Sequence, residues 1–417
     1  MLIHSASQVV TLAGGPRRGA GPVDPVIIPD GAMLVRDGLI LEVGQSEDLL
    51  RRFPDEEKLN ASGRSVIPGL VDPHTHLVWA GDRAAEFEMR LQGKTYMEIM
   101  SAGGGINATV RATRVATPDD LLTQTRARAR GMFRHGTTTA EAKTGYGLEL
   151  QAELSQLDVL MKLDQEGPLE ITPTLMPAHA IPPEYNGRED EYTRVVCEEM
   201  LPAMKTWWQQ RSRGRPLPFV DVFCEAGAFN LAQSETILAS ARSLGFELKA
   251  HVDEFENLGG AALAVRLGAV SIEHAVKTSP EELALLGSSD TVVISLPCTP
   301  FGLAQAQYTP ARELLKAGGL LAIATDLNPG TAWCESMQFV IALACRYLRL
   351  APAEALAAAT INAAAAIRRQ EIIGSIEPGK QADLLILSVD DYRHLGYRFG
   401  GNLVQTVIKK GRVYHQN

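Results

Sequence analysis

The central part of the chain alternates short apolar segments with longer amphipathic ones. The short segments have the apolar, β-branched composition of buried strands, and turn residues bound them. The predicted strands are Ser65–Asp72, Thr137–Ala142, Ile171–Met176, Phe219–Phe223, Glu247–Val252, Ala269–His274, Thr291–Leu296 and Leu320–Asp326. Helical stretches lie between most of them, and the clearest are Asp119–His135, Glu149–Gln165, Gln233–Leu244 and Ala353–Arg369. These alternations predict an α/β fold of the (β/α)8 TIM-barrel type, and a doubly wound open sheet is the alternative.

Both ends of the chain show a different pattern, in which short strands are joined by tight turns. Asp37-Gly38 separates the apolar runs Ala32–Arg36 and Leu39–Val43, which is a strong hairpin signal. Near the C-terminus, Ala382–Leu387 and Val404–Lys409 are strand-like as well. We therefore predict a small β-sandwich domain built from residues 1–65 plus 374–417, around a barrel domain of residues 66–373. Two unrelated terminal hairpins are the alternative.

The composition narrows the class of protein. Hydrophobic residues make up 45% and charged residues 21%, so the chain can bury a large core and is not intrinsically disordered. A net charge of −9 disfavours nucleic acid or an anionic membrane as a partner. The five cysteines form no C-x-x-C pair, which fits a reducing cytoplasm better than a disulfide framework or a cysteine-based zinc site. No uncharged apolar run is long enough for a membrane span, and no secretory signal is recognisable.

The clearest chemical signal is a His-x-His pair at the end of the first predicted barrel strand. The apolar run up to Asp72 continues into His74-Thr75-His76. Because side chains at i and i+2 of an extended chain point to the same side, His74 and His76 can share one metal ion. Neutral imidazoles suit zinc or ferrous iron. Taken alone, the pair is weak, since two polar residues at a strand end give the same pattern.

Further potential ligands stand at the ends of other predicted strands, where barrels gather their chemistry. The fifth strand ends near His251, the sixth at His274 and the eighth at Asp326, while His179 follows the third. Of nine histidines, five lie at such ends or in the loops after them. Scattered histidines would rarely concentrate in this way, which favours a metal site.

We expect one divalent cation, held by three histidines and one carboxylate: His74, His76, His251 and Asp326. Such a cation lowers the pKa of water to about 7, and Asp326 can accept a proton from that water and return it to a leaving nitrogen. His274 can polarise a carbonyl or take part in proton transfer, or it is a packed core histidine. A second ion is not expected, because the fourth strand ends at Cys224-Glu225 without a bridging Lys. Glu225 either orients a ligand or forms a salt bridge elsewhere.

Four parts of the sequence carry a family resemblance: Asp72–Arg83 with Glu86–Gly93, Gly103–Ile106 with Glu141–Leu148, His251–Glu254, and Ala324–Thr331. They resemble the amidohydrolase superfamily and, within it, the imidazolonepropionase family, over nearly the whole chain. The resemblance implies hydrolytic ring opening of 4-imidazolone-5-propanoate to N-formimidoyl-L-glutamate, in histidine degradation, by a metal-activated water. It also implies one zinc or iron ion per chain, with zinc preferred, a homodimer, and a cytoplasmic location.

By motif position, the resemblance implies the metal ligands named above and catalytic roles for His274, Asp326 and Glu254. It further implies a substrate-binding set: Arg83, Tyr146, His179, Glu254, Asn328, Gly330 and Thr331. Arg83 would grip the substrate propionate with two parallel N–H bonds, and backbone N–H groups at Gly330 could bind an anion. The alternatives are a salt bridge for Arg83, a packed aromatic for Tyr146, a solvated carboxylate for Glu254 and a plain turn at Gly330.

Two segments differ from the family pattern: Glu273 before His274, and Leu296–Pro300 after the seventh strand. Cys298 lies in the second of them, either as a lining thiol or as a buried structural one. Two rival functions remain. A deaminase would use the same metal set on an aromatic base and would release ammonia. A non-catalytic barrel is the other rival, but such relatives lose metal ligands, and all four positions are filled here.

Overall fold

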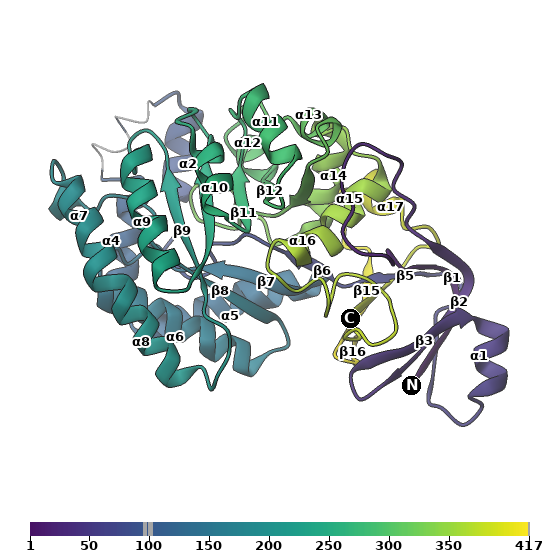
Figure 1. The fold of residues 1–417 in the computed structure, drawn as a ribbon. Helices are drawn as coiled ribbons and strands as arrows, with labels where there is room; N and C mark the ends of the chain where they lie inside the picture. The colour runs from purple at the N-terminus through teal and green to yellow at the C-terminus, as the bar shows by residue number, and fades with distance from the viewer. Residues whose placement is uncertain (95–97, 99–102, 416–417) are drawn as a thin grey trace.

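The computed structural model describes residues 1–94, 98 and 103–415, and its centre is a parallel barrel (Figure 1). In this described part of the chain, an eight-stranded sheet runs in the order β13-β12-β11-β10-β9-β8-β7-β6. Its strands are β6 (Leu70–Asp72), β7 (Thr137–Lys143), β8 (Glu170–Ala178), β9 (Phe219–Cys224), β10 (Glu247–Val252), β11 (Ser271–His274), β12 (Val292–Ser295) and β13 (Leu320–Ile323). Each of the eight predicted segments contributes one of these strands, and the predicted barrel is confirmed.

The first and last barrel strands meet through the residues that follow them. Thr75 and Leu327 form a parallel bridge, and the backbone N–H of His76 donates to Leu327 O at 2.9 Å. The N–H of Thr325 donates to the Asp72 carboxylate at 3.2 Å. The sheet therefore closes at its carboxyl end, and these bonds bring the His-x-His segment next to the segment that carries Asp326.

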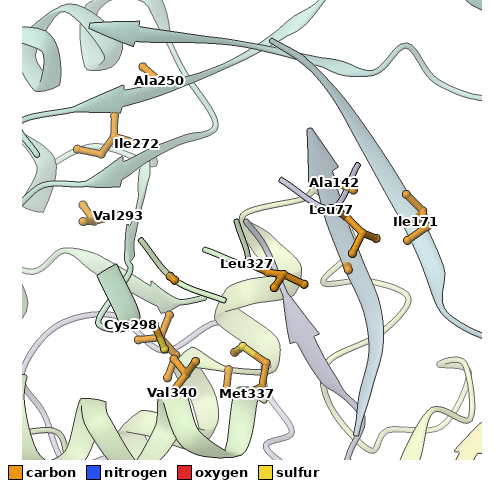
Figure 2. Close-up of a cluster of buried hydrophobic side chains, with 14 of the residues drawn as sticks. Leu77, Ala142, Ile171, Ala250, Ile272, Val293, Cys298, Leu327, Met337 and Val340 are labelled. Atoms are coloured by element: carbon orange, nitrogen blue, oxygen red, sulfur yellow. The ribbon is translucent and has the colours of Figure 1, made fainter. Parts of the chain in front are cut away.

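Along the barrel strands, polar and apolar side chains alternate. Ala142, Ala250 and Ile272 belong to the large hydrophobic cluster that also includes residues of the surrounding helices (Figure 2). Their neighbours in the strands, such as Lys143 and His251, therefore face the barrel interior, because successive side chains of a strand point to opposite faces. The fold thus places a row of titratable groups inside the barrel, at the carboxyl ends of the strands.

Helices surround the barrel, and several begin with an ordinary cap. Thr117 is the N-cap of α5 (Pro118–Arg134) and accepts the N–H of Asp120, as its place in the sequence predicts. Around the barrel, the described residues up to Tyr347 also form α2 (Ala84–Leu91), α4 (Ile106–Val115), α6 (Leu150–Glu166), α7 (Glu189–Val195), α8 (Leu201–Arg211), α9 (Leu231–Ser243), α10 (Gly260–Leu267), α11 (Pro280–Gly287), α12 (Cys298–Gly302), α13 (Ala311–Lys316) and α14 (Met337–Tyr347). Two short segments, η1 (Pro183–Tyr185) and η2 (Val196–Met200), flank α7.

The single helix predicted over Ala353–Arg369 is wrong, because two shorter helices occupy this stretch. They are α15 (Pro352–Ala358) and α16 (Ile361–Ala365), with Thr360 between them at φ −135° and ψ −93°. After the break, Asn362 donates to the carbonyls of Arg17 at 2.9 Å and of Leu321 at 2.8 Å. The residues of α16 pack with inward apolar side chains of β12 and β13. This short helix therefore packs on the apolar side chains inside the barrel, below the layer of titratable groups at the carboxyl ends of the strands.

The strands of both chain ends form a second sheet beside the barrel, and the two termini lie close to it (Figure 1). Within the described residues it has eight strands, in the order β16-β15-β14-β5-β1-β2-β3, with β4 paired to β1. They are β1 (Leu2–Val10), β2 (Ile27–Arg36), β3 (Leu39–Gln45), β4 (Lys58–Asn60), β5 (Ser65–Pro68), β14 (Leu384–Leu387), β15 (Val404–Lys409) and β16 (Arg412–His415). The short helix α1 (Ser46–Arg52) packs on this sheet, whereas α17 (His394–Tyr397), between β14 and β15 in the sequence, packs on α14 and α15. The predicted composite β-domain of both termini is confirmed as one hydrogen-bonded sheet.

The predicted strand Ser65–Asp72 serves both sheets. Its first part, β5, pairs with β1 and β14, and its second part, β6, pairs with β7. The turn between them is at Gly69, where a Cβ would lie 2.3 Å from Thr138 Oγ1. Glycine is therefore required by the close approach of β7. The division into residues 1–65 plus 374–417 and 66–373 stays a prediction, and its first boundary falls inside β5, which pairs with the terminal sheet.

A helix that spans a membrane must be both long and apolar. Within residues 1–94, 98 and 103–415, no helix combines the length and the apolar character that crossing a bilayer requires.

Candidate active site

Four side chains predicted to hold a metal ion converge at the carboxyl end of the barrel. His74 Nε2 lies 3.3 Å and His76 Nε2 3.7 Å from Asp326 Oδ1, and His251 Nε2 lies 3.3 Å from His76 Nε2. All four residues are buried. The segment with His74 and His76 and the segment with Asp326 are more than two hundred residues apart in the sequence. The closure of the barrel brings them together.

The donor set fits a divalent cation. Both ring nitrogens of His74 and Nδ1 of His76 are buried without a hydrogen-bond partner in the described structure. Buried polar atoms normally have partners, so these nitrogens are arranged for a group other than protein. Burial lowers the pKa of His74 and of His76 well below the usual range, and Lys143 and His179 respectively add to the effect. Neutral imidazoles beside a carboxylate are what zinc or iron requires.

Beneath this site lies a buried network of charged groups that the sequence interpretation did not include. Asp221 Oδ1 is 3.0 Å from His251 Nδ1, and its Oδ2 accepts a hydrogen bond from Lys143 Nζ at 2.7 Å. Lys143 Nζ also donates to Glu141 Oε1 at 2.6 Å. Burial alone would raise the pKa of Asp221, but His251 and Lys143 lower it strongly, so Asp221 is a carboxylate. In the sequence, Glu141, Lys143 and Asp221 are charged positions within otherwise uncharged strands, and this pattern could have identified them.

Asp326 is held by α12, the short helix that follows the seventh barrel strand, β12. The hydroxyl of Thr299 donates to Asp326 Oδ2, and burial raises the pKa of Asp326 to about 6. Thr299 belongs to the Leu296–Pro300 segment, so that segment positions one of the predicted metal ligands. Its neighbour Cys298 is 3% exposed and packs in the hydrophobic cluster, as a buried structural thiol would.

His274 and Glu254 face each other beside the metal ligands. Glu254 Oε2 lies 3.4 Å from His274 Nε2. Burial lowers the pKa of His274 well below its usual range, and burial raises that of Glu254 well above its own. His274, Asp253 and Asp326 have φ values of 69°, 56° and 53°, a region that non-glycine residues rarely adopt. The strand ends are thus turned sharply inward at this site.

Tyr146 and His179 form one wall next to His76. The His179 ring stacks on the His76 ring, with centroids 4.6 Å apart and an interplanar angle of 14°. His179 Nδ1 hydrogen-bonds with Gly145 O at 3.0 Å, and burial lowers the pKa of His179 to about 3. Tyr146 lies at a centroid distance of 5.2 Å from His179, and burial raises the pKa of its phenol. Both side chains are neutral, with polar atoms available beside the predicted metal site.

Arg83 is anchored before any ligand binds. Its Nε and Nη2 donate to Glu86 Oε2 at 2.9 and 2.8 Å, which is the salt bridge that the sequence left open as an alternative. Its Nη1 lies against the backbone of Gly330, where a Cβ would be 2.3 Å away. Arg90 Nη2 donates to Gly330 O at 2.9 Å. The contacts of Arg83 with Glu86 leave Nη1 without a bond to that carboxylate. A second arginine, Arg90, contacts Gly330 as well.

Asn328, Gly330 and Thr331 form a closed loop after β13. Asn328 Oδ1 accepts the N–H groups of Gly330 and Thr331, both at 2.8 Å, and Asn328 Nδ2 donates to Asp326 O at 2.7 Å. The backbone N–H of Gly330, which the sequence offered for anion binding, is donated within the loop. The Asn328 amide therefore fixes the loop that carries Asp326.

Glu225 plays neither of the two roles expected for it. Its carboxylate accepts the backbone N–H groups of Phe255 at 2.9 Å and of Glu256 at 3.1 Å. These residues follow Glu254 directly. Glu225 therefore stabilises the loop after β10, while Asp221 contacts the ligand His251.

Comparisons with known proteins agree with this arrangement. A model described as the amidohydrolase family matches residues 65–414, and one described as the imidazolonepropionase-like composite domain of bacteria matches residues 31–55. A curated relative from Herpetosiphon aurantiacus, named imidazolonepropionase, is 50% identical over 416 residues, 100% of this chain and 97% of the relative. A second one with that name, from Chloroflexus aggregans, is 50% identical over 421 residues, 100% of this chain and 99% of the relative.

Solved structures with lower sequence identity share the architecture. An adenosine deaminase from Xanthomonas campestris, solved with bound zinc, matches with a TM-score of 0.68 at 22% identity. The match covers 99% of this chain and 92% of that chain. At this identity, the likeness concerns the fold alone.

Proposed function

Because the chain belongs to the amidohydrolase family, and within it to the imidazolonepropionases, we propose that it opens the ring of 4-imidazolone-5-propanoate by hydrolysis. The product is N-formimidoyl-L-glutamate, and the reaction is a step of histidine degradation. The observation that carries the proposal is the convergence of His74, His76, His251 and Asp326 in a buried site with unpartnered imidazole nitrogens.

We propose that these four residues hold one divalent cation, zinc or iron, with zinc preferred. Three imidazoles and one carboxylate support this, because four protein ligands of this kind leave room for water or a substrate atom. When bound, such a cation acts as a Lewis acid and lowers the pKa of water to about 7. Metal analysis of the purified protein distinguishes zinc from iron and measures the number of ions per chain.

In the proposed reaction, water adds its oxygen to the ring carbonyl carbon, and the bond from this carbon to the ring nitrogen breaks. Asp326 Oδ1 accepts a proton of the water and returns it to the leaving nitrogen. The other proton of the water is lost from the new carboxylic acid.

The remaining side chains position the substrate. Arg83 would bind the propionate through Nη1, since Nε and Nη2 are held by Glu86. Tyr146 and His179 would bind the ring from the wall beside His76, and Glu254 with His274 would stabilise the carbonyl oxygen and a ring nitrogen. The loop of Asn328, Gly330 and Thr331 would close the far end. Such positioning lowers the barrier by removing the entropy of a chance encounter.

The decisive experiment uses metal-replete protein and freshly prepared 4-imidazolone-5-propanoate. Loss of the imidazolone ultraviolet absorbance is followed, with a chelated sample and a reaction without protein as controls, since the substrate decays by itself. We expect rapid, metal-dependent loss with N-formimidoyl-L-glutamate as the product. A rate equal to that of the uncatalysed control, in protein that holds its metal ion, would contradict the proposal.

A deaminase is the competing activity, because it would use the same ligands. Ammonia release from purines and pyrimidines distinguishes the two, and we expect none above background. We further propose that the chain is a cytoplasmic homodimer, as the family resemblance implies. Light scattering after size exclusion tests the dimer, and fractionation of cells tests the location.

A further inference from the structure

Lys143 is a fully buried lysine that the roles assigned above do not use. It ends β7 at 0% exposure, directly beneath the predicted metal ligands. Burying an ammonium group is expensive unless charged partners surround it. Lys143 has two such partners, Glu141 Oε1 at 2.6 Å and Asp221 Oδ2 at 2.7 Å. The site therefore includes a buried cation at its base.

Asp221 connects this cation to a predicted ligand. While Oδ2 is bound to Lys143, Oδ1 accepts the backbone N–H of His251 at 3.2 Å and lies 3.0 Å from His251 Nδ1. The distance allows a proton on His251 Nδ1 to be donated to Asp221 Oδ1. Nε2 then keeps its lone pair and faces His76 Nε2 at 3.3 Å. A carboxylate in this position fixes the tautomer and the ring orientation of a metal-binding histidine.

Glu141 forms the second arm of the same arrangement. Its Oε2 accepts the N–H of Thr75 at 3.2 Å, and the Thr75 hydroxyl donates to Glu141 O at 2.7 Å. Thr75 lies between His74 and His76 in the sequence, and its carbonyl accepts the N–H of Lys143 at 2.9 Å. Lys143 thus binds two carboxylates that each contact a segment with predicted metal ligands. Asp221 contacts His251, and Glu141 contacts Thr75, between His74 and His76.

We propose that Lys143 is a positioning residue, whose ammonium group fixes the Asp221 carboxylate so that Asp221 orients the His251 imidazole toward the metal ion. This proposal rests on the metal site of the proposed function, but not on its substrate. Without the ammonium group, the Asp221 carboxylate loses its partner at Oδ2 and its fixed orientation. The consequence is a weaker hold on the metal ion, beyond any loss of stability.

Lys249 provides a matched control. It is equally buried, on β10, and its Nζ donates to Ser271 Oγ at 2.9 Å and Glu273 Oε1 at 3.4 Å. No contact with Asp221 is recorded for it among the described residues. Lys249→Met therefore removes a buried ammonium group whose hydrogen-bond partners are Ser271 and Glu273 rather than Asp221. The other oxygen of Glu273, Oε2, lies 4.0 Å from His251 Nδ1, so this control reports any contribution that Glu273 makes to the support of His251.

The experiment measures the affinity of the metal-free full chain for Zn²⁺ by competition with a chromophoric chelator. Variants Lys143→Met, Asp221→Asn and Lys143→Met/Asp221→Asn are compared with Lys249→Met. We expect Lys143→Met and Asp221→Asn each to weaken zinc binding by about 10- to 100-fold. The double variant, which removes one charge of each sign, should bind zinc within about threefold of Asp221→Asn, because Lys143 acts through Asp221. Lys249→Met should stay within about threefold of the wild type.

Thermal unfolding of the metal-free variants separates positioning from a general loss of stability. Should Lys143→Met fail to fold, Asp221→Asn still tests the support of His251, and Lys143→Arg, which keeps the positive charge, should keep most of the wild-type affinity. Wild-type affinity in folded Lys143→Met, equal weakening by Lys249→Met, or full additivity in the double variant would each overturn the proposal. Wild-type protein that binds no zinc overturns it together with the metal site, whereas zinc binding without hydrolysis refutes only the proposed reaction.

Discussion

Glu254 Oε2 lies 3.4 Å from His274 Nε2, and both groups are largely shielded from solvent beside the predicted metal ligands. Burial raises the pKa of Glu254 and lowers that of His274, so both shifts favour the uncharged forms. Such a pair can donate a hydrogen bond to a carbonyl oxygen and exchange a proton with a ring nitrogen. Charge developing on the substrate then meets a preorganised donor.

Glu254→Gln and His274→Asn test this relationship. Each variant should lower kcat by about 10²- to 10⁴-fold, because general acid–base groups contribute on this scale, while KM changes less. If the two residues act as a pair, the double variant should be no slower than the poorer single one. Steady-state kinetics on 4-imidazolone-5-propanoate measure all three. Additive losses would mean that the residues act independently.

Removal of the metal ion gives a second test, of the predicted metal site. Dialysis against a chelator should abolish activity, and added Zn²⁺ should restore it and raise the Tm. A ligand that binds only the folded state stabilises it by about 2.7 kcal/mol at 100 times its Kd. His251→Ala and Asp326→Ala should lose both activity and the Zn²⁺-dependent rise in Tm. Retention of that rise in either variant would show that the residue does not hold the ion.

Gly330 offers a test of the role of Arg83. In Gly330→Ala, the new Cβ would lie 2.3 Å from Arg83 Nη1, the end of a side chain that can move aside. We therefore expect almost unchanged stability, but a KM raised by about tenfold, as the guanidinium group is displaced from its place for the propionate. Gly21→Ala is the control, because a Cβ there meets nothing within 4 Å. An unchanged KM in Gly330→Ala would contradict the proposal that Arg83 binds the substrate propionate.

Much of the fold was predictable, because it depends on local patterns. The predicted strand Glu247–Val252 coincides with β10, and Thr117 caps α5 as expected. The break at Thr360 was not predictable, since it accompanies contacts of Asn362 with Arg17, which is 345 positions away in the sequence. A helix propensity summed over Ala353–Arg369 contains no information about such a partner.

The same distinction applies to the site. His74, His76, His251 and Asp326 could be found because each stands at the end of a predicted strand, where a barrel gathers its chemistry. The contact of Lys143 with Asp221 spans 78 positions and depends on the order and register of β7, β8 and β9. Sequence patterns indicate that both residues face inward, but not that they touch. The sequence therefore offered Glu225 as a residue that could orient a metal ligand, whereas the structure places Asp221 against His251.

Glu170 gives a prediction for the joint between the barrel and the terminal sheet. Its carboxylate accepts hydrogen bonds from Lys409 at 2.9 Å, Arg369 at 3.0 Å and Gln381 at 3.0 Å. Burial alone would raise the pKa of Glu170, but Lys409 and Arg369 hold it well below the ordinary value of 4.5. Glu170→Gln should therefore lower the free energy of unfolding at pH 7 by about 1.5–3 kcal/mol, the range for hydrogen bonds to charged groups.

The pH dependence of this effect has a definite sign. Since the pKa of Glu170 is depressed in the folded state, its contribution to stability is complete above the unfolded value of about 4.5. As the pH falls below that value, the unfolded chain takes up the proton first, and the contribution declines. Urea unfolding at pH 7, 5.5 and 4 should show the wild type approaching Glu170→Gln only at the lowest pH. A constant difference across this range would contradict the assignment of the effect to the Glu170 carboxylate.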